Sequence, residues 1–246
     1  MMNGYIILAA AIAGYLIGSF SNARLITRIF APGKDISRTQ VHIDGTEKAF
    51  DLRVVSATTV SINLGARYGF ITMLLDMLKI ILPILAVKHF FPEHPYFLIT
   101  AAAGMVGHIW PIYYRFKGGR GILAVYGTMF AIDWIGAIVT SVAGMIFGLA
   151  VLRNVVAAYI VGVVFIIPWL WFRTHDIAYV IYAVIINLIM AVAVSPEIKE
   201  MNRLKKEDGW DDPIVVFQMT GMGRGIVKMA KLIGVIKPKP KQDPEV

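Results

Sequence analysis

The residues best suited to chemistry lie in one short stretch near the middle of the chain. Gly107-His108-Ile109-Trp110-Pro111 is followed, three residues later, by Arg115-Phe116-Lys117-Gly118-Gly119-Arg120-Gly121. Glycines let the backbone approach a ligand closely, and the lysine and second arginine bring positive charge. An apolar helix is expected just after this stretch, and a helix N-terminus favours an anion. The pattern predicts a phosphate-binding turn. The plainer alternative is a tight loop whose basic residues only follow the tendency of Lys and Arg to lie on the cytoplasmic side of a membrane.

Three further side chains could take part in chemistry near this turn. Asp76 and Lys79 lie three residues apart, on one face of an expected apolar helix. Charges inside a membrane are costly and usually functional, so we expect the pair to contribute to substrate binding; a purely structural ion pair is the alternative. His108 could act as a general base near neutral pH or fix the following loop through a hydrogen bond.

The composition shows where these residues must be held. Hydrophobic residues make up 57% of the 246 residues and charged residues 16%, whereas soluble domains are nearer half apolar and a quarter charged. Since an apolar run of about 20 residues spans a bilayer as a helix, we predict an all-α integral membrane protein with about seven transmembrane helices. Six is the alternative if the fourth and fifth form one re-entrant unit. The expected spans are 4–23, 69–91, 96–115, 120–132, 134–152, 155–173 and 176–195.

The basic residues predict the orientation of these helices. With the N-terminus outside and seven spans, 21 of the 24 Lys and Arg residues fall in cytoplasmic segments, as the positive-inside rule requires. The C-terminus is then cytoplasmic, and the net charge of +8 needs no nucleic-acid partner. The chain has no cysteine, and its histidines lack metal-ligand spacing, so we predict no metal site.

Two polar regions are expected beside the membrane. The transmembrane domain, 1–195, contains a large cytoplasmic loop at 24–68 that looks poor in helix, with a small hairpin at 41–50 turning at Asp44-Gly45. A basic cytoplasmic tail occupies 196–246. Its amphipathic stretch at 215–235 suits a surface of anionic lipid or packs on the inner loops.

Several motifs together resemble a known family. Gly-His-x-x-Pro, four residues, then Phe-Lys-Gly-Gly-Arg-Gly is similar to the pattern of the acyl-phosphate-dependent glycerol-3-phosphate acyltransferases of bacterial membranes, the PlsY family, with Arg120 in place of a lysine. Other matches occur in order along the chain, over about 14–204: Gly18-Ser19, Asp51-Leu52-Arg53, Ala57-Thr58-Thr59-Val60, Leu64-Gly65, and Asp76 with Leu78-Lys79.

The resemblance implies a function and a set of site residues. It implies transfer of an acyl group from acyl phosphate to glycerol 3-phosphate, giving lysophosphatidic acid in the plasma membrane of a prokaryote, with no metal and no cofactor. The implied partners are these two substrates and membrane lipid. We expect His108, Lys117 and Arg53 to be catalytic. We expect phosphate or substrate contacts from Ser19, Ser56, Thr58, Asp76, Lys79, Gly118, Gly119, Arg120 and Gly121.

Two departures from the family pattern keep alternatives open. Only Val54, Val55 and Ser56 stand where the family has a Gly-Ser-Gly-Asn-x-Gly turn, and Glu197 and Glu200 stand where it has His and Asn. The alternatives are another phosphorylated acceptor, a non-catalytic or regulatory paralogue that binds phosphorylated lipid, and a small-anion transporter. The chain is short for a transporter and shows no inverted repeat.

Overall fold

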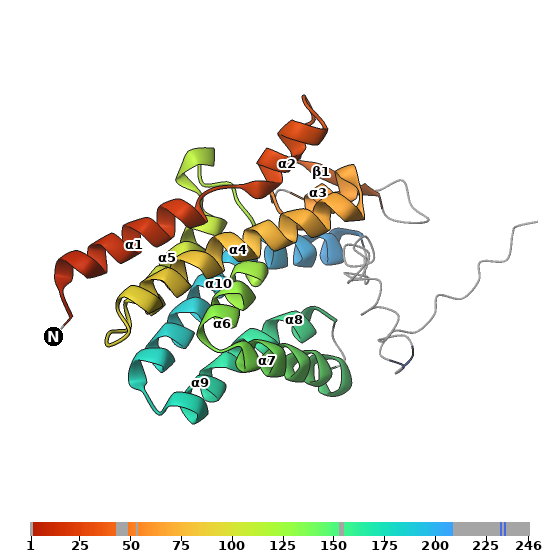
Figure 1. Ribbon diagram of the computed structural model, residues 1–246. Helices are drawn as coiled ribbons and strands as arrows, with labels where there is room; N and C mark the ends of the chain where they lie inside the picture. The colour runs from red at the N-terminus through yellow and green to blue at the C-terminus, as the bar shows by residue number, and fades with distance from the viewer. Residues whose placement is uncertain are drawn as a thin grey trace, which may run out of the picture.

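The computed structural model describes residues 2–42, 49–52, 54–152, 155–208, 232 and 234. Within these ranges the side chains of 41–42, 49–51, 155–159, 197 and 200–208 are left undescribed. Ten α-helices and a two-stranded hairpin follow one another in the described residues (Figure 1). They are α1 Gly4–Gly18, α2 Asn22–Phe30, β1 Thr39–His42, β2 Ala49–Leu52, α3 Ala57–Leu64, α4 Ala66–Phe90, α5 Tyr96–Ile109, α6 Ile122–Ile132, α7 Trp134–Ile146, α8 Val155–Val164, α9 Ile166–Thr174 and α10 Ile177–Asp208. A 3-10 turn, η1 (Ile112–Tyr114), and a π-turn, η2 (Phe147–Val151), complete them.

Each of the seven predicted apolar segments contains helix. Five helical segments are long and apolar enough to cross a membrane: Gly4–Phe30, Ala66–Phe90, Tyr96–Tyr114, Trp134–Val151 and Ile177–Pro196. Two others are shorter, Ile122–Ile132 and Ile160–Thr174. At 1.5 Å per residue the 11 residues of α6 extend about 16 Å, roughly half the hydrocarbon thickness. The helical class is confirmed, and the number of crossings stays a prediction.

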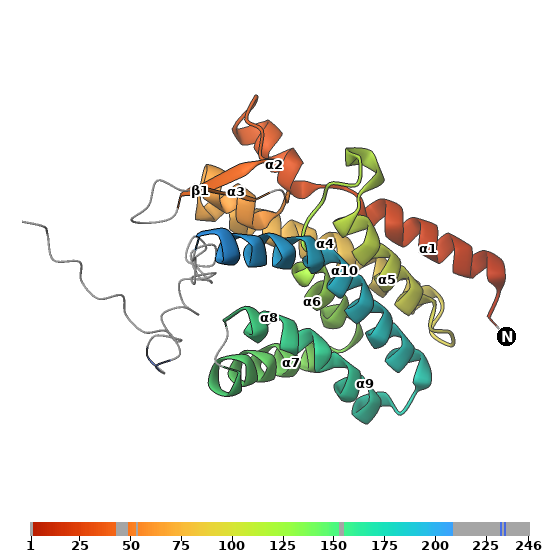
Figure 2. The same ribbon diagram turned by 180° about the vertical axis from the view of Figure 1, so that it is seen from behind.

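Helices α1 and α5 lie side by side in both views (Figures 1 and 2). Their backbones touch because glycines stand at the contact. A Cβ built on Gly14 would lie 2.5 Å from the carbonyl oxygen of Thr100, and one on Gly18 would lie 2.2 Å from that of Gly104. Small residues allow this close approach between membrane helices. The contact fixes the end of α1 against the end of α5, where the Gly-His motif lies.

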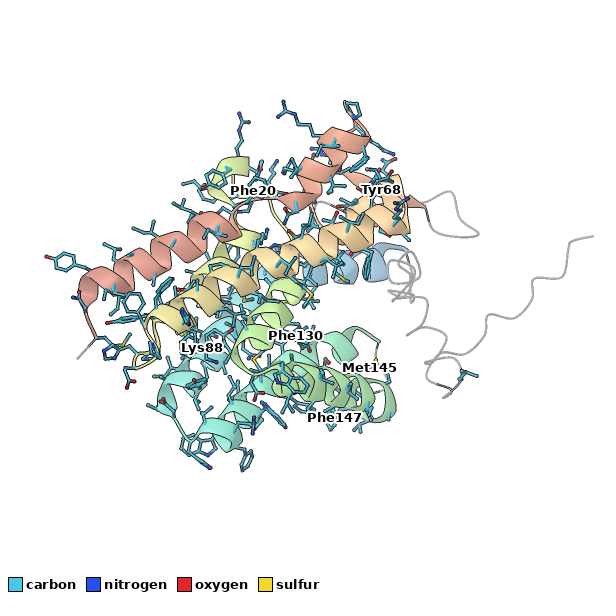
Figure 3. The ribbon with its side chains drawn as sticks, viewed as in Figure 1. Phe20, Tyr68, Lys88, Phe130, Met145 and Phe147 are labelled. Carbon is cyan, nitrogen blue, oxygen red and sulfur yellow. The ribbon has the colours of Figure 1, made fainter. Side chains whose placement is uncertain are left out.

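The main core joins α4, α5, α6, α9 and α10. Ile80, Met105, Met129, Leu170 and Ile186 are among its fully buried side chains. Large apolar side chains on the outer faces are instead exposed, such as Leu8 in α1, Leu82 in α4 and Leu188 in α10. Such faces suit contact with lipid. Figure 3 places Tyr68 at the start of α4 beside α2, and Lys88 near the other end of the same helix.

Asp133 links α7 to α9 outside the main core. As the N-cap of α7, its carboxylate accepts hydrogen bonds from the backbone N–H of Gly136 (3.2 Å), from Trp169 Nε1 (2.9 Å) and from Arg173 Nε (3.1 Å). Burial raises the pKa of this carboxyl, but the bonds from Trp169, Gly136 and Arg173 outweigh it and leave the pKa below its ordinary value. The three donors stabilise the ionised form.

The polar loop at 24–68 contains more helix than predicted. The description of this loop as helix-poor was wrong, because α2 and α3 occupy much of it. Ser21 and Ser56 are their N-caps, and serine is a preferred residue there. A small second core, made of Ala23, Ile26, Ile36, Val55 and Val60, holds both helices against the start of α4. Burial of this core outweighs the weak helix propensity of the segment.

The predicted hairpin is present in its described part. β1 pairs antiparallel with β2, and His42 lies opposite Ala49. Its turn, 43–48, lies outside the described residues, as does the predicted amphipathic stretch of the tail apart from Leu232 and Gly234. Helix α10 continues without a break across residue 195, where the sequence places the start of the tail.

Candidate functional site

The site begins at a break between α1 and α2. The sequence predicted one helix over 4–23, but α1 ends at Gly18 and α2 starts at Asn22. The carbonyl of Phe20, in the break, accepts a hydrogen bond from Lys79 Nζ of α4. Asn22 Nδ2 donates to Asp76 Oδ1 of the same helix at 3.0 Å. Polar groups from α4 therefore hold the break; Figure 3 shows Phe20 in the link between α1 and α2.

Asp76 and Lys79 form the ion pair expected from their spacing. Lys79 Nζ lies 3.1 Å from Asp76 Oδ1, and the two side chains are 10% and 4% exposed. A buried pair is tolerated when further hydrogen bonds satisfy its remaining donors and acceptors. Asn22 and the Phe20 carbonyl supply such bonds here. The pair thus has a structural role, and it also lines the pocket described below.

The glycine loop returns from the end of α5 to the same place. The N–H of Gly119 donates to the carbonyl of His108 at 3.2 Å, and the N–H of Val55 donates to the carbonyl of Gly118 at 3.0 Å. The first bond ties the loop to α5, and the second ties it to the short segment before α3. The N–H of Gly119, a residue expected to contact phosphate or substrate, is therefore already paired with the His108 carbonyl in this structure.

Three glycines of this loop are required by their surroundings. A Cβ on Gly118 would lie 2.3 Å from the His108 carbonyl oxygen, and one on Gly119 would lie 2.5 Å from His108 Nε2. Gly121 has φ +91°, and its Cβ would lie 2.6 Å from Ile109 Cδ1. The glycines let the loop lie directly on the end of α5, with the His108 ring against Gly119.

These segments surround a small cavity of about 10 Å³, roughly the space that one water molecule needs. Its polar character comes from the Asp76–Lys79 pair and from two buried atoms, Ser19 Oγ and His108 Nδ1, which have no hydrogen-bond partner among the described residues. Unpaired buried polar atoms are costly, and a polar ligand would satisfy them. The pocket is lined by Ser19, Phe20, Ser21, Val55, Asp76, Lys79, His108, Pro111, Gly118 and Gly119.

The structure brings together six of the predicted site residues: Ser19, Asp76, Lys79, His108, Gly118 and Gly119. Others lie beside the pocket without lining it. Lys117 has an exposed side chain, Arg120 is half-buried and Gly121 is the N-cap of α6. Ser56 and Thr58 are half-buried at the start of α3. Arg53 lies outside the described residues, as do the side chains of Glu197 and Glu200.

Four lining residues were missed by sequence reasoning. Phe20, Ser21, Val55 and Pro111 lie in the break of α1, before α3 and after α5. Pro111 belongs to the Gly-His-x-x-Pro motif, which could have signalled it, and Ser21 is a preferred helix N-cap. Phe20 and Val55 carry no chemical signature. The part of the chain that the structure describes contains no group of three His, Asp or Glu that could hold a metal ion.

Comparison with known proteins identifies the family. The family model described as "Glycerol-3-phosphate acyltransferase" matches residues 8–204. The chain belongs to this family. Its glycine loop, its intramembrane ion pair and its helical frame all lie within the matched range.

Individual relatives agree with this assignment. The chain is 34% identical over 126 residues to a glycerol-3-phosphate acyltransferase of Pelagibacter ubique, covering 51% of this chain and 59% of that protein. It is 31% identical over 128 residues to one of Aquifex aeolicus, covering 50% of this chain and 57% of that protein. The alignments thus span a little over half the length of these two relatives.

Two solved structures share the fold. They are crystal structures of PlsY, an integral membrane glycerol 3-phosphate acyltransferase, in its lysophosphatidic acid form and its glycerol 3-phosphate form. Each is 25% identical to this chain, covering 80% of this chain and 92% of that chain, with TM-scores of 0.63 and 0.64. The predicted resemblance and the helical membrane class are confirmed.

Proposed function

We propose that the protein transfers an acyl group from an acyl phosphate to the 1-hydroxyl of glycerol 3-phosphate. The products are lysophosphatidic acid and inorganic phosphate, made at the plasma membrane of a prokaryote for phospholipid synthesis. The observation that carries the proposal is the convergence of Ser19, Lys79, His108 and the glycine loop on one pocket. Family membership and the likeness to PlsY in its glycerol 3-phosphate form support it.

The proposed reaction needs positioning and charge more than a covalent intermediate. The hydroxyl oxygen of the acceptor attacks the acyl carbonyl carbon and forms the new ester bond. The bond between that carbon and the phosphate oxygen then breaks, and the hydroxyl proton leaves with the phosphate. Because the donor is already activated, holding the reactants together and offsetting the charge of two phosphates supply most of the catalysis.

The pocket residues divide these tasks. Lys79 offers an ammonium group inside the pocket, and Ser19 Oγ and His108 Nδ1 can bond substrate oxygens. Lys117, on the same loop, and Arg53 remain proposed catalytic residues, and Arg120 remains a proposed phosphate contact. His108 also positions the loop, through its carbonyl bond from Gly119 and its ring contact with that glycine.

Phe20 marks the side from which an acyl chain would approach the pocket. Its side chain lines the pocket and is still 43% exposed, at the end of a helix whose outer face carries exposed apolar side chains such as Leu16 and Ile17. An acyl chain lying along α1 in the lipid would bring its phosphate end to Ser19 and Lys79. This arrangement suits a donor that arrives from the membrane.

The test is acyl transfer by the purified full-length protein in lipid. It receives palmitoyl phosphate and labelled glycerol 3-phosphate, with palmitoyl-CoA as the alternative donor and dihydroxyacetone phosphate as the alternative acceptor. We expect lysophosphatidic acid only with palmitoyl phosphate. Lys117→Ala should lose most of the activity, whereas Arg28→Ala, which removes an exposed basic residue of α2, should keep it.

Other outcomes would redirect the assignment. Product only from the alternative acceptor would show the same fold acting on another phosphorylated substrate. A folded protein that binds glycerol 3-phosphate or lysophosphatidic acid without turnover would contradict catalysis and support the second candidate function, a non-catalytic or regulatory member that binds phosphorylated lipid. The segment Val54-Val55-Ser56, in place of the family's longer glycine turn, favours that second candidate.

A further inference from the structure

Arg24 reaches from α2 to the glycine loop. It is the third residue of α2, one turn beyond the break that forms one wall of the pocket. Its Nη2 donates to the carbonyl of Lys117 at 3.2 Å, and its guanidinium carbon lies 4.9 Å from the centre of the Tyr114 ring. The side chain therefore contacts the loop on both sides of Arg115 and Phe116.

The loop segment between these two contacts is strained. Arg115 and Phe116 have φ angles of +53° and +60°, a conformation that costs a residue other than glycine roughly 1–2 kcal/mol. Consecutive residues of this kind persist when surrounding contacts hold them. Within the loop, the N–H of Phe116 donates to the Pro111 carbonyl and that of Lys117 to the Tyr114 carbonyl. The bond from Arg24 to the Lys117 carbonyl comes from another element.

Arg24 also joins the two walls of the pocket. Asn22, two residues earlier, ties the start of α2 to Asp76. Gly118, immediately after Lys117, carries the carbonyl bonded by Val55, and Gly119 lies on His108. A connection thus runs from the ion pair through α2 and Arg24 to the glycines that close the pocket.

We propose that Arg24 is a positioning residue that holds the glycine loop over the pocket. This role rests on the proposed acyltransferase function, because the loop then binds the phosphate-bearing substrates. The guanidinium is suited to the task because it stacks on an aromatic ring while donating in its own plane. Lysine has the charge without that geometry, so charge and positioning can be separated by substitution.

The first measurement follows the loop directly and needs no turnover. Because the chain has no cysteine, a single nitroxide label can be placed on Arg115→Cys, whose side chain is exposed, and a control label on Glu93→Cys, exposed between α4 and α5. We expect Arg24→Ala to increase nanosecond motion of the label at 115 and to leave the label at 93 unchanged. Tyr114→Leu should act like Arg24→Ala.

The second measurement is the effect on acyl transfer. We expect Arg24→Ala, Arg24→Lys and Tyr114→Leu each to lower kcat/KM for glycerol 3-phosphate about tenfold, mainly through KM, at an unchanged Tm. Tyr114→Phe keeps the ring and should match the parent. The double variant Arg24→Ala/Tyr114→Leu should lose little more than either single variant, because the two residues act through one contact.

Three results would overturn the inference. They are an unchanged label at 115 in Arg24→Ala, full activity of Arg24→Lys, or additive losses in the double variant. A parent protein without transferase activity would instead sink the proposed function, and the label at 115 would still decide whether Arg24 holds the loop.

Discussion

His108 and the glycines after it form a single steric unit. The residue types were readable from the sequence, which predicted a glycine turn and a histidine with either a basic or a loop-fixing role. The contact between Gly119 and the His108 ring was not readable. It depends on how the chain turns back after α5, through two residues of positive φ that no sequence pattern announces.

Replacing Gly119 by alanine tests this unit. The new Cβ would lie 2.5 Å from His108 Nε2, so the ring or the loop must move. We expect acyl transfer to fall by about 10²-fold, the order of loss that a misplacement near 1 Å causes. Gly4→Ala is the matched control, since nothing lies within 4 Å of its Cβ. Equal activities of the two variants in an initial-rate assay would contradict the contact.

The Asp76–Lys79 pair makes a second residue-level prediction. Lys79→Met leaves the carboxylate buried without its ammonium partner, and breaking a buried pair in this way costs about 3–5 kcal/mol. The double variant Asp76→Leu/Lys79→Met removes both charges and should recover much of that loss. Denaturant unfolding in micelles measures both. If the double variant were no more stable than Lys79→Met, the pairing would not be what stabilises this region.

At the scale of elements, the break between α1 and α2 could not be predicted from the sequence. The apolar run continues through Phe20, so the sequence predicts one helix to residue 23. The break is fixed by Lys79 and by the Asn22–Asp76 bond, whose partners are more than 50 residues apart in sequence. The hairpin was predictable because its turn signal is local. Helix α3 was not, because its threonines and valine favour strands and its stability comes from the second core.

The contact between α7 and α9 through Asp133 leads to a prediction about pH at the scale of elements. The folded-state pKa of Asp133 lies below its ordinary value of 3.8. Its ionised carboxylate therefore stabilises the fold above pH 3.8, and this contribution is lost as the pH falls through the lower folded-state pKa. We expect Tm to fall on acidification below pH 4 by less in Asp133→Asn than in the parent. Parallel Tm curves for the two proteins in that range would show that Asp133 does not carry this contribution.

For the whole molecule, hydropathy and charge were enough to predict the helical membrane class, since bilayer thickness and backbone pairing leave few alternatives. They did not determine whether the shorter helices cross the membrane, because α6 has only 11 residues. The site needed the packing of four distant segments: the end of α1, the segment before α3, the middle of α4 and the loop after α5. Only the loop after α5 carries a glycine motif, and α4 is marked by its two charged residues.

The predicted orientation can be tested in intact cells. We expect a membrane-impermeant maleimide added outside to label Glu93→Cys and to spare Arg115→Cys until the membrane is opened. The absence of native cysteine makes the background clean. Labelling of residue 115 from outside would contradict the predicted topology, because it would place the glycine loop on the outer side of the membrane.

The direct backbone contact between α1 and α5 has a consequence for biogenesis. Gly18 meets Gly104, yet a ribosome adding roughly 5–20 residues per second makes the second about 4–17 s after the first. During that interval α1 must wait in the bilayer with its glycine face turned to lipid or to the insertion machinery. The pocket needs the ends of both helices. It can therefore assemble only after α5 has entered the membrane and packed against α1.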